Sequence, residues 1–491
     1  MIRNAHLPFA TILRIQSRHV RHASTTSTSR APKEEGSISA IFTTLTDEAH
    51  VELPARFAKL KQEMWNDGLR QSWKEVLGEL EHAVEEVAAK GQDIIPQIAY
   101  ADLQKGLAGE QAAAVKKAGV VVVKGAVSKE EALGWKQDIK DYAAANVSRV
   151  KGFPPDNVQV FELYNTRSQT RARTHPNILN TQRALLSLWH ASEPSSEISL
   201  RTPISYFDRL RIRQPGDSKF TLGPHVDAGS VERWEDPGYR ACYSKILAGG
   251  SQWRDHDPFD ASPRLNAKQD LYNTSNQCSI FRPWQGWTSM SSTGPGEGTL
   301  RVLPMLHLSS AYMILRPFFR LRSGAASQLP VANPDSWEPD LDSPSFPGSA
   351  IMKTQELNEK THPHFQLQKT MTSIPKVEPG DQVYWHCDGV HAVESHHGGQ
   401  GDSSVLYIPA VPLTLHNALY LRDQRINFLS GLPAPDFPGG EGESKFVGRG
   451  SVGDVASSGG RQALGLQPFE SDPSTSVKNN LIERANALLL A

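Results

Sequence analysis

One stretch of the chain, residues 221–230, reads T-L-G-P-H-V-D-A-G-S and decides the expected fold. It places His225 and Asp227 two positions apart in a segment that we expect to be extended. Side chains at positions i and i+2 of a strand point to the same face, so one imidazole and one carboxylate can bind the same ion. A distant second histidine would complete the two-histidine, one-carboxylate triad that holds Fe(II) and leaves coordination positions open.

Candidates for the second histidine follow a turn and a strand near residue 380. Residues 377–381 read V-E-P-G-D and precede an apolar strand expected over 382–385. His386 directly follows this strand, and His391 lies ten residues after Asp381. Two histidines and a carboxylate also suit a zinc ion with a bound water, so the residues alone leave the metal open.

Four separated segments resemble the Fe(II)/2-oxoglutarate oxygenase superfamily, whose core is a double-stranded β-helix. They are the strand and capped helix at 119–129, the H-x-D at 225–227, the G-x-L-x-x-x-P at 298–304 and the P-G-D…H at 379–391. In that superfamily the distal ligand follows such a turn and strand, ten residues after the aspartate. The resemblance therefore favours His391 over His386.

A narrower resemblance covers most of the chain. Residues 223–234 read G-P-H-V-D-A-G-S-V-E-R-W and, with D-P-G-Y-R at 236–240, resemble the YbiU-like proteins from about residue 50 to the C-terminal region. The two resemblances imply a mainly β fold with helical flanks (α+β) around a double-stranded β-helix, a jelly-roll, cupin-like core. They also imply an oxygenase that holds Fe(II) with His225, Asp227 and His391. It would use 2-oxoglutarate as co-substrate and hydroxylate or oxidise a small molecule.

The far carboxylate of 2-oxoglutarate needs a cationic partner, most naturally a bidentate arginine. In much of the superfamily this arginine lies on the strand after the distal histidine, but residues 398–407 read G-G-Q-G-D-S-S-V-L-Y and contain no Arg or Lys. The substitutes that we expect lie on or beside predicted strands and are, in order, Arg301, Arg213 and Arg282, with the hydroxyls of Ser404 and Tyr407 as further donors.

The missing arginine leaves two other functions open. The chain could be a non-catalytic cupin-type protein that binds a metal or ligand, or a zinc-dependent hydrolase on the same scaffold. A net charge of −1, from 52 basic and 53 acidic residues, argues against a nucleic-acid partner. No apolar run is long enough to span a membrane. The partner that the oxygenase resemblance implies is a small-molecule substrate.

Composition divides the chain into four expected regions. Residues 1–33 contain no Asp or Glu and are rich in Arg and Ser, which is typical of a mitochondrial transit peptide. This predicts import into the matrix, with the cytoplasm as the alternative. The other regions are an N-terminal helical part over 50–117, a jelly-roll domain over 118–430 with insertions at 232–276 and 325–363, and a mobile Gly/Ser-rich segment with a terminal helix over 437–491.

Overall fold

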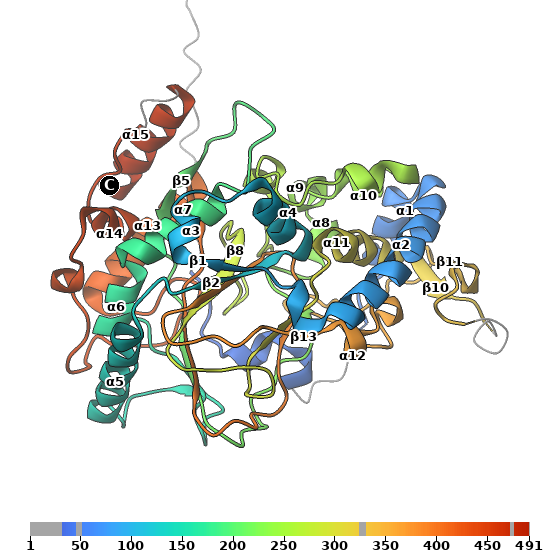
Figure 1. The fold of residues 1–491 in the computed structure, drawn as a ribbon. Coiled ribbons are helices and arrows are strands. Elements are labelled where there is room, and N and C mark those ends of the chain that lie inside the picture. Colours follow the sequence, from blue (N-terminus) through green and yellow to red (C-terminus); the bar gives the residue numbers. More distant parts are fainter. Residues whose placement is uncertain (1–31, 46–51, 324–329, 472–475, 491) are drawn as a thin grey trace, which may run out of the picture. The chain divides into compact units, whose positions relative to one another are not determined.

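The valine run at 120–123 forms β2 (Val120–Lys124) in the computed structural model of the chain (Figure 1). All four valines are buried, as expected of β-branched side chains in a central strand. α5 (Lys129–Ala145) follows, and at its start the Ser128 hydroxyl accepts a hydrogen bond from Glu131 N. The structure describes residues 32–45, 52–323, 330–471 and 476–490, so the transit peptide expected over 1–33 lies almost wholly outside it.

The larger sheet has eight strands among the described residues. In order across the sheet they are β1 (Gln97–Ala99), β2, β14 (Gln382–His386), β8 (Trp284–Ser289), β16 (Ser403–Tyr407), β6 (Leu210–Arg213), β4 (Val160–Phe161) and β3 (Gly152–Phe153). Only the β1–β2 pair is parallel, and the other pairs are antiparallel. Such a sheet can present one face to a cavity and the other to packed helices.

The second sheet is smaller and carries the H-x-D stretch. Its strands, in order, are β12 (Gln355–Glu356), β7 (His225–Val226), β15 (His391–Val393), β9 (Leu300–Val302) and β13 (Thr372–Ser373). From β6 to β9, and again from β14 to β16, consecutive strands alternate between the sheets, because β6, β8, β14 and β16 belong to the larger one and β7, β9 and β15 to the smaller one. Two further pairs join β10 (Phe319–Leu321) with β11 (Trp337–Pro339) and β5 (Ile198–Ile204) with β17 (Val411–Thr414).

Helices pack around the sheets and also run through the expected insertion at 232–276, whereas the described residues of the insertion expected at 325–363 form β11 and β12 and no α-helix. The first group is α1 (Arg56–Met64), α2 (Gly68–Lys90), α3 (Tyr100–Leu103), α4 (Gly109–Ala118), α6 (Arg167–Arg173) and α7 (Pro176–Leu186). The middle group is α8 (Glu232–Glu235), α9 (Pro237–Ala241), α10 (Ser244–Leu247), α11 (Leu306–Leu315) and α12 (Leu367–Thr370). The last group is α13 (Leu415–Ser430), α14 (Ser458–Ala463) and α15 (Ser476–Leu490). Figure 1 shows α1, α2 and α11 on one side and α13 to α15 on the other.

The protein is therefore a mixed α and β structure with large sheets, and the expectation of a mainly β protein understated its helices. The helical periodicity of residues 53–89 predicts a pair of helices, which the structure shows as α1 and α2. Residues 277–281, which the sequence predicts to be a short strand, form no strand in the described fold, because side chains rather than a neighbouring strand take their backbone donors. Ser279 N donates to Asp436, and Phe281 N donates to Asn417. The Gly/Ser-rich segment, expected to be mobile, buries Phe437 and Glu443.

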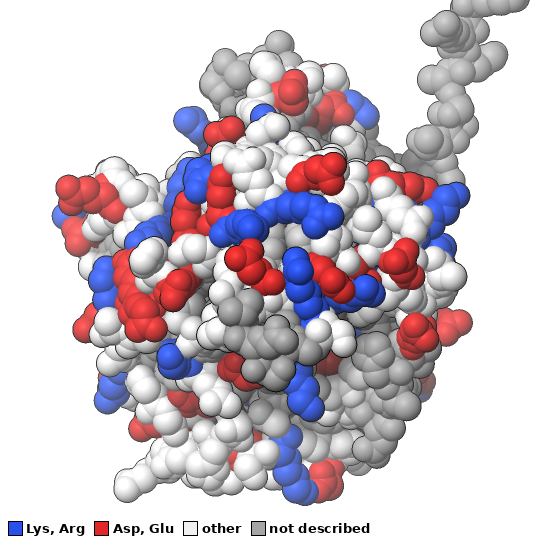
Figure 2. Space-filling view, turned by 90° about the vertical axis from the view of Figure 1, so that its right-hand side faces the viewer, with Lys and Arg blue, Asp and Glu red and all other residues white. Residues whose placement is uncertain are grey.

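Charged side chains of both signs are interspersed on the face shown in Figure 2. Ion pairs also join separate parts of the chain, since Arg254 in the 232–276 insertion contacts Glu75 and Glu79 of α2. These pairs fasten the N-terminal helices to the insertion. Within the described residues, no helix combines the length and the apolar character that crossing a membrane requires.

Candidate metal centre

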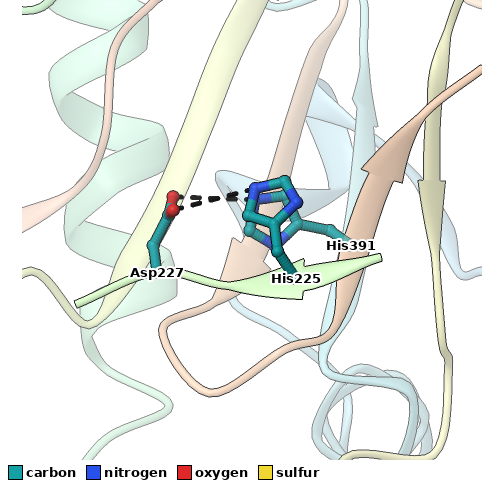
Figure 3. Close-up of side chains that lie close together, drawn as sticks. All are labelled: His225, Asp227 and His391. Carbon is teal, nitrogen blue, oxygen red and sulfur yellow. Dashed lines mark ion pairs between the residues drawn. The ribbon is translucent and has the colours of Figure 1, made fainter. Parts of the chain in front are cut away.

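His225, Asp227 and His391 come together between neighbouring strands of the smaller sheet (Figure 3). His225 on β7 is directly paired with His391 on β15, and Asp227 follows the end of β7. Nε2 of His225 lies 3.7 Å from Oδ1 of Asp227, and Nε2 of His391 lies 3.6 Å from Oδ2. The strand ends there because Ala228 and Gly229 have positive φ angles of 62° and 90°. The H-x-D spacing thus puts both side chains on one face, as the sequence predicts.

Backbone carbonyls fix the orientation of both imidazoles. Nδ1 of His225 lies 2.7 Å from the carbonyl oxygen of Gly223, and Nδ1 of His391 lies 3.0 Å from that of Gly389. A carbonyl can only accept, so Nδ1 of each ring carries the proton and Nε2 keeps its lone pair. Both lone pairs are directed toward Asp227 (Figure 3). A histidine that binds a metal usually donates its other ring N–H to a carbonyl or carboxylate in this way. The three residues therefore fit a divalent ion.

The local electrostatics give two of these groups the protonation states that a metal requires. Burial and the neighbouring His391 lower the pKa of His225 to about 4, so His225 is neutral near pH 7. Burial opposes the charge of Asp227, but the adjacent imidazoles of His391 and His225 and the guanidinium of Arg282 together hold the pKa of its carboxyl below the usual range. A neutral imidazole and an ionised carboxylate are the forms that bind metals.

The three side chains border a cavity of about 120 Å³ between the two sheets. Its polar wall includes three arginines, Arg209, Arg211 and Arg282, together with Tyr407. Arg282 lies closest to the centre, with Nη2 3.9 Å from Oδ2 of Asp227. Of the five co-substrate residues expected from the sequence, the structure brings Arg282 and Tyr407 to this cavity.

The other three expected residues do not line the cavity within the described structure. Arg301 is paired with Ala392, so it projects from the strand face opposite to His391, and it donates a hydrogen bond to the Met371 carbonyl. Arg213 is fully buried, and its guanidinium is held by Asp217, at 2.8 Å, and by the Glu394 carbonyl, at 2.7 Å. Ser404 donates to Asp402 at 2.7 Å, beyond the reach of the centre.

Sequence reasoning missed Arg209 and Arg211, although a signal for them exists. Residues 209–213 alternate basic and apolar side chains, and Leu210 and Ile212 pack in a core cluster with α5 and α7. The arginines must then face the other side of β6, which is the cavity side. Arg211 donates through Nη2 to the Ser403 hydroxyl at 3.2 Å, whereas its buried Nε has no partner among the described residues.

His386, the alternative distal ligand, lies in a different cluster. Its Nε2 lies 3.0 Å from the Pro258 carbonyl, its Nδ1 accepts from Asp388 N at 3.0 Å, and its ring stacks on Trp189. Both nitrogens are therefore occupied, and neither is directed at His225 or Asp227. The structure brings His391, not His386, to the candidate centre.

Three comparisons place these features among known proteins. The Gig2-like family model matches residues 51–466. "Uncharacterized protein YbiU" of Escherichia coli K12 is 32% identical over 390 residues, which are 77% of this chain and 87% of that protein. The resemblance to YbiU-like proteins is thereby confirmed.

Two solved structures share the fold over most of the chain. The GlcNAc-inducible GIG2 protein (DUF1479) of Candida albicans is 31% identical, with a TM-score of 0.80 and coverage of 90% of this chain and 96% of that one. A Salmonella typhimurium LT2 protein solved as a "Putative Oxidoreductase" is 30% identical, with a TM-score of 0.71 and coverage of 86% and 100%.

Proposed function

The chain belongs to the Gig2-like family, and from this membership and the geometry of the centre we propose that it is a non-haem Fe(II), 2-oxoglutarate-dependent oxygenase that hydroxylates or oxidises a small molecule. One observation carries the proposal. Two histidines with free Nε2 atoms and an ionised aspartate converge on a cavity that arginines also line. The name of the Salmonella relative agrees with this reaction class. The alternation of strands between two sheets supports a double-stranded β-helix core.

The three ligands would occupy one face of the iron and leave the other positions to ligands from the cavity. With 2-oxoglutarate bound, an iron held by these residues would supply the chemistry that couples reduction of O₂ and decarboxylation of the co-substrate, to succinate and CO₂, with insertion of one oxygen atom into a substrate C–H bond. The protein's own contribution is to orient the reactants and exclude water. Arg282 places a positive charge 3.9 Å from the Asp227 carboxylate and thereby contributes to keeping it ionised.

Arg211 is our candidate for binding the far carboxylate of 2-oxoglutarate. In much of the Fe(II)/2-oxoglutarate oxygenase superfamily this arginine lies on the strand after the distal histidine. Here that strand is β16, and β6 is hydrogen-bonded directly beside it. Arg211 is paired with Val405 and contacts Ser403, so its guanidinium replaces a side chain of β16 from the adjacent strand. Burial lowers the pKa of Arg211, and a bound carboxylate would offset that desolvation.

The same observation weakens the non-catalytic alternative. That alternative rested on the absence of a basic residue over 398–407, and Arg211 now offers the missing charge to the same cavity. A zinc-dependent hydrolase would use the same three ligands but no 2-oxoglutarate, so binding of the co-substrate together with the identity of the metal distinguishes the two.

An anaerobic titration tests the proposal directly. Protein purified without oxygen and loaded with Fe(II) should develop a visible metal-to-ligand charge-transfer band when 2-oxoglutarate is added, and should form succinate when air is admitted. Iron bound without such a band would refute 2-oxoglutarate as co-substrate. Tight zinc binding with hydrolytic turnover would favour the hydrolase.

The matrix location remains part of the proposal, and it rests on the composition of residues 1–33 alone. A fluorescent protein fused behind these residues should enter mitochondria. The same fusion with the arginines of residues 1–33 replaced by glutamine should stay in the cytoplasm.

A further inference from the structure

A short N-terminal segment, Lys33–Leu45, contributes a wall to the cavity of the metal centre. We call it the N-terminal strap, and it contains the 3₁₀ turns η1 (Ile38–Ile41) and η2 (Thr43–Leu45). Three of its side chains line the cavity, namely Ile38, Ile41 and Phe42. The Phe42 ring stands edge-on to the imidazole of His225, with 4.9 Å between the ring centroids. The strap precedes residues 51–466, which the family model matches, so this wall lies outside the family's matched region.

The strap is fixed at its start by a buried ammonium group. Nζ of Lys33 lies 2.7 Å from Asp270 and 3.2 Å from Asp436, and it also donates to the carbonyls of Thr274 and Gln277. The Lys33 side chain is 2% exposed. Removing a charge this deep from water is costly unless every partner is in place. The contact is therefore specific to the docked position of the strap.

The far end of the strap is fixed to the strand beside His225. Thr354 N donates to the Ile41 carbonyl at 2.7 Å, and Thr44 N donates to a carboxylate oxygen of Glu356 at 3.2 Å. Glu356 belongs to β12 and is paired with His225 on β7. The apolar side chains of the strap are thus held at a defined position next to a predicted metal ligand.

The strap is also connected to a cavity arginine through one amide. Nδ2 of Asn276 donates to the Gly36 carbonyl at 2.9 Å, and Oδ1 of the same side chain accepts from Nη1 of Arg209 at 3.0 Å. Nε of Arg209 pairs with the Asp208 carboxylate at 3.4 Å, whereas Nη2 makes no hydrogen bond to the described part of the chain, and both residues line the cavity. Asn276 thereby connects the strap to the Arg209 guanidinium and fixes their positions relative to each other.

We propose that the N-terminal strap is part of the substrate site and that the substrate is a small organic anion with an apolar portion. This inference rests on the proposed function, with Arg211 reserved for the co-substrate. The anionic group of the substrate binds Arg209, and its apolar portion packs on Ile38, Ile41 and Phe42. These three side chains then determine specificity, whereas the metal ligands and Arg211 serve any substrate.

An outer cavity of about 830 Å³ agrees with this arrangement. It shares Asn276 and Phe437 with the inner cavity and is lined on one side by Glu35, Gly36 and Ser37 of the strap. The strap thus borders both spaces. A substrate that enters through the outer cavity passes Asn276 and Arg209 before it reaches the centre.

Calorimetric titration with straight-chain carboxylates, from acetate to hexanoate, tests the inference. With saturating 2-oxoglutarate and Fe(II) under anaerobic conditions, each added methylene should tighten binding two- to fourfold, as expected for burial of a CH₂ group. Phe42→Ala, or the milder Phe42→Leu if the first variant is unstable, should reduce this increment. Leu45→Ala is the matched control, because Leu45 belongs to the strap but does not line the cavity. Arg209→Met should weaken all chain lengths by the same factor.

Two further results keep this inference separable from the proposed function. The charge-transfer band should persist in the Phe42 and Arg209 variants, and the same titration on metal-free protein reports the chain-length preference even if no band ever forms. Lys33→Met should flatten the preference as Phe42→Ala does, because it releases the strap. Carboxylates that bind without regard to length in the unaltered protein would overturn the inference. So would a Phe42→Ala variant that binds every length more tightly, since the strap would then be a plug.

Discussion

The described part of the chain contains two clusters of three possible metal ligands, and the comparison of their hydrogen bonds favours one of them as a metal site. In the candidate centre, each histidine has one nitrogen bound to a carbonyl and the other free toward Asp227. In the second cluster, His386, Cys387 and Asp388 also bring their ligand atoms within 4.8 Å of one another. There, however, both nitrogens of His386 already have protein partners, and the three residues line neither the cavity of the candidate centre nor the outer cavity.

The second cluster is instead a charge network that joins the 232–276 insertion to the larger sheet. Asp388 binds the guanidinium of Arg264 and accepts a hydrogen bond from the Tyr243 hydroxyl at 2.9 Å. Burial opposes its charge, but Arg264 outweighs this and lowers the pKa of Asp388 below the usual range. The comparison shows that proximity of ligand atoms does not define a metal site. A metal site also needs lone pairs that have no protein partner and that face an open space.

The largest expected effect is loss of the metal. His391→Ala removes one of three ligands and should weaken Fe(II) binding by at least about 1000-fold. This exceeds the 10- to 100-fold loss that is typical when only the hydrogen-bond partner of a ligand is removed. Metal stoichiometry after anaerobic loading and desalting measures this. His386→Ala should keep one iron per chain once its folding is verified by circular dichroism. If His386→Ala lost the iron and His391→Ala kept it, the assignment of the two clusters would be reversed.

The second cluster should respond in stability rather than in metal content. Asp388→Asn leaves the buried charge of Arg264 without its partner and should lower the free energy of unfolding by about 3–5 kcal/mol. Urea denaturation measures the change, and iron content should stay at the level of the unaltered protein. Asp335→Asn, at an exposed pair with Lys74, is the control and should change stability by less than about 1 kcal/mol.

Much of the fold could be predicted because it depends on local signals. The valine run of β2, the Ser128 cap and the helix pair α1 and α2 are each encoded by neighbouring residues. The H-x-D pair could also be predicted, since strand periodicity fixes its shared face.

Features that depend on long-range packing could not be predicted in the same way. Which face of β6 borders the cavity is decided by distant helices, so Arg211 was passed over in favour of Arg301. Both arginines lie on strands, and only the pairing of β9 with β15 shows that Arg301 projects from the opposite face to His391. The contribution of the N-terminal strap likewise depends on contacts with residues more than 200 positions away, such as Lys33 with Asp436.

A buried carboxyl without an arginine bonded to it should behave in the opposite way to Asp388. Burial raises the pKa of Glu232 to about 7, although hydrogen bonds from Ser230 N and Gln277 partly oppose this. Between pH 4.5 and 7 the folded protein holds this proton and the unfolded chain does not, so stability should fall by about 3 kcal/mol as pH rises through this range. Glu232→Gln should remove that slope in urea titrations at pH 5 and pH 8. Exposed Glu63→Gln is the control, and an unchanged slope in Glu232→Gln would contradict the assignment.

The smallest of these effects bears most directly on what the centre does. Hydrogen bonds to charged groups contribute about 1.5–3 kcal/mol, so Arg211→Met should weaken 2-oxoglutarate binding by about 30-fold. The charge-transfer band gives the dissociation constant, while iron affinity should not change, because Arg211 is not among the predicted ligands. Arg301→Met changes an arginine outside the cavity lining and should leave the constant within about twofold. A metal centre alone does not distinguish an oxygenase from a hydrolase. If Arg211→Met bound 2-oxoglutarate more weakly at full iron occupancy, this result would distinguish the two enzymes. The effect requires that the carboxylate of the co-substrate binds beside the metal. Equal constants in the two variants would mean that another cation, Arg282 first, binds the co-substrate.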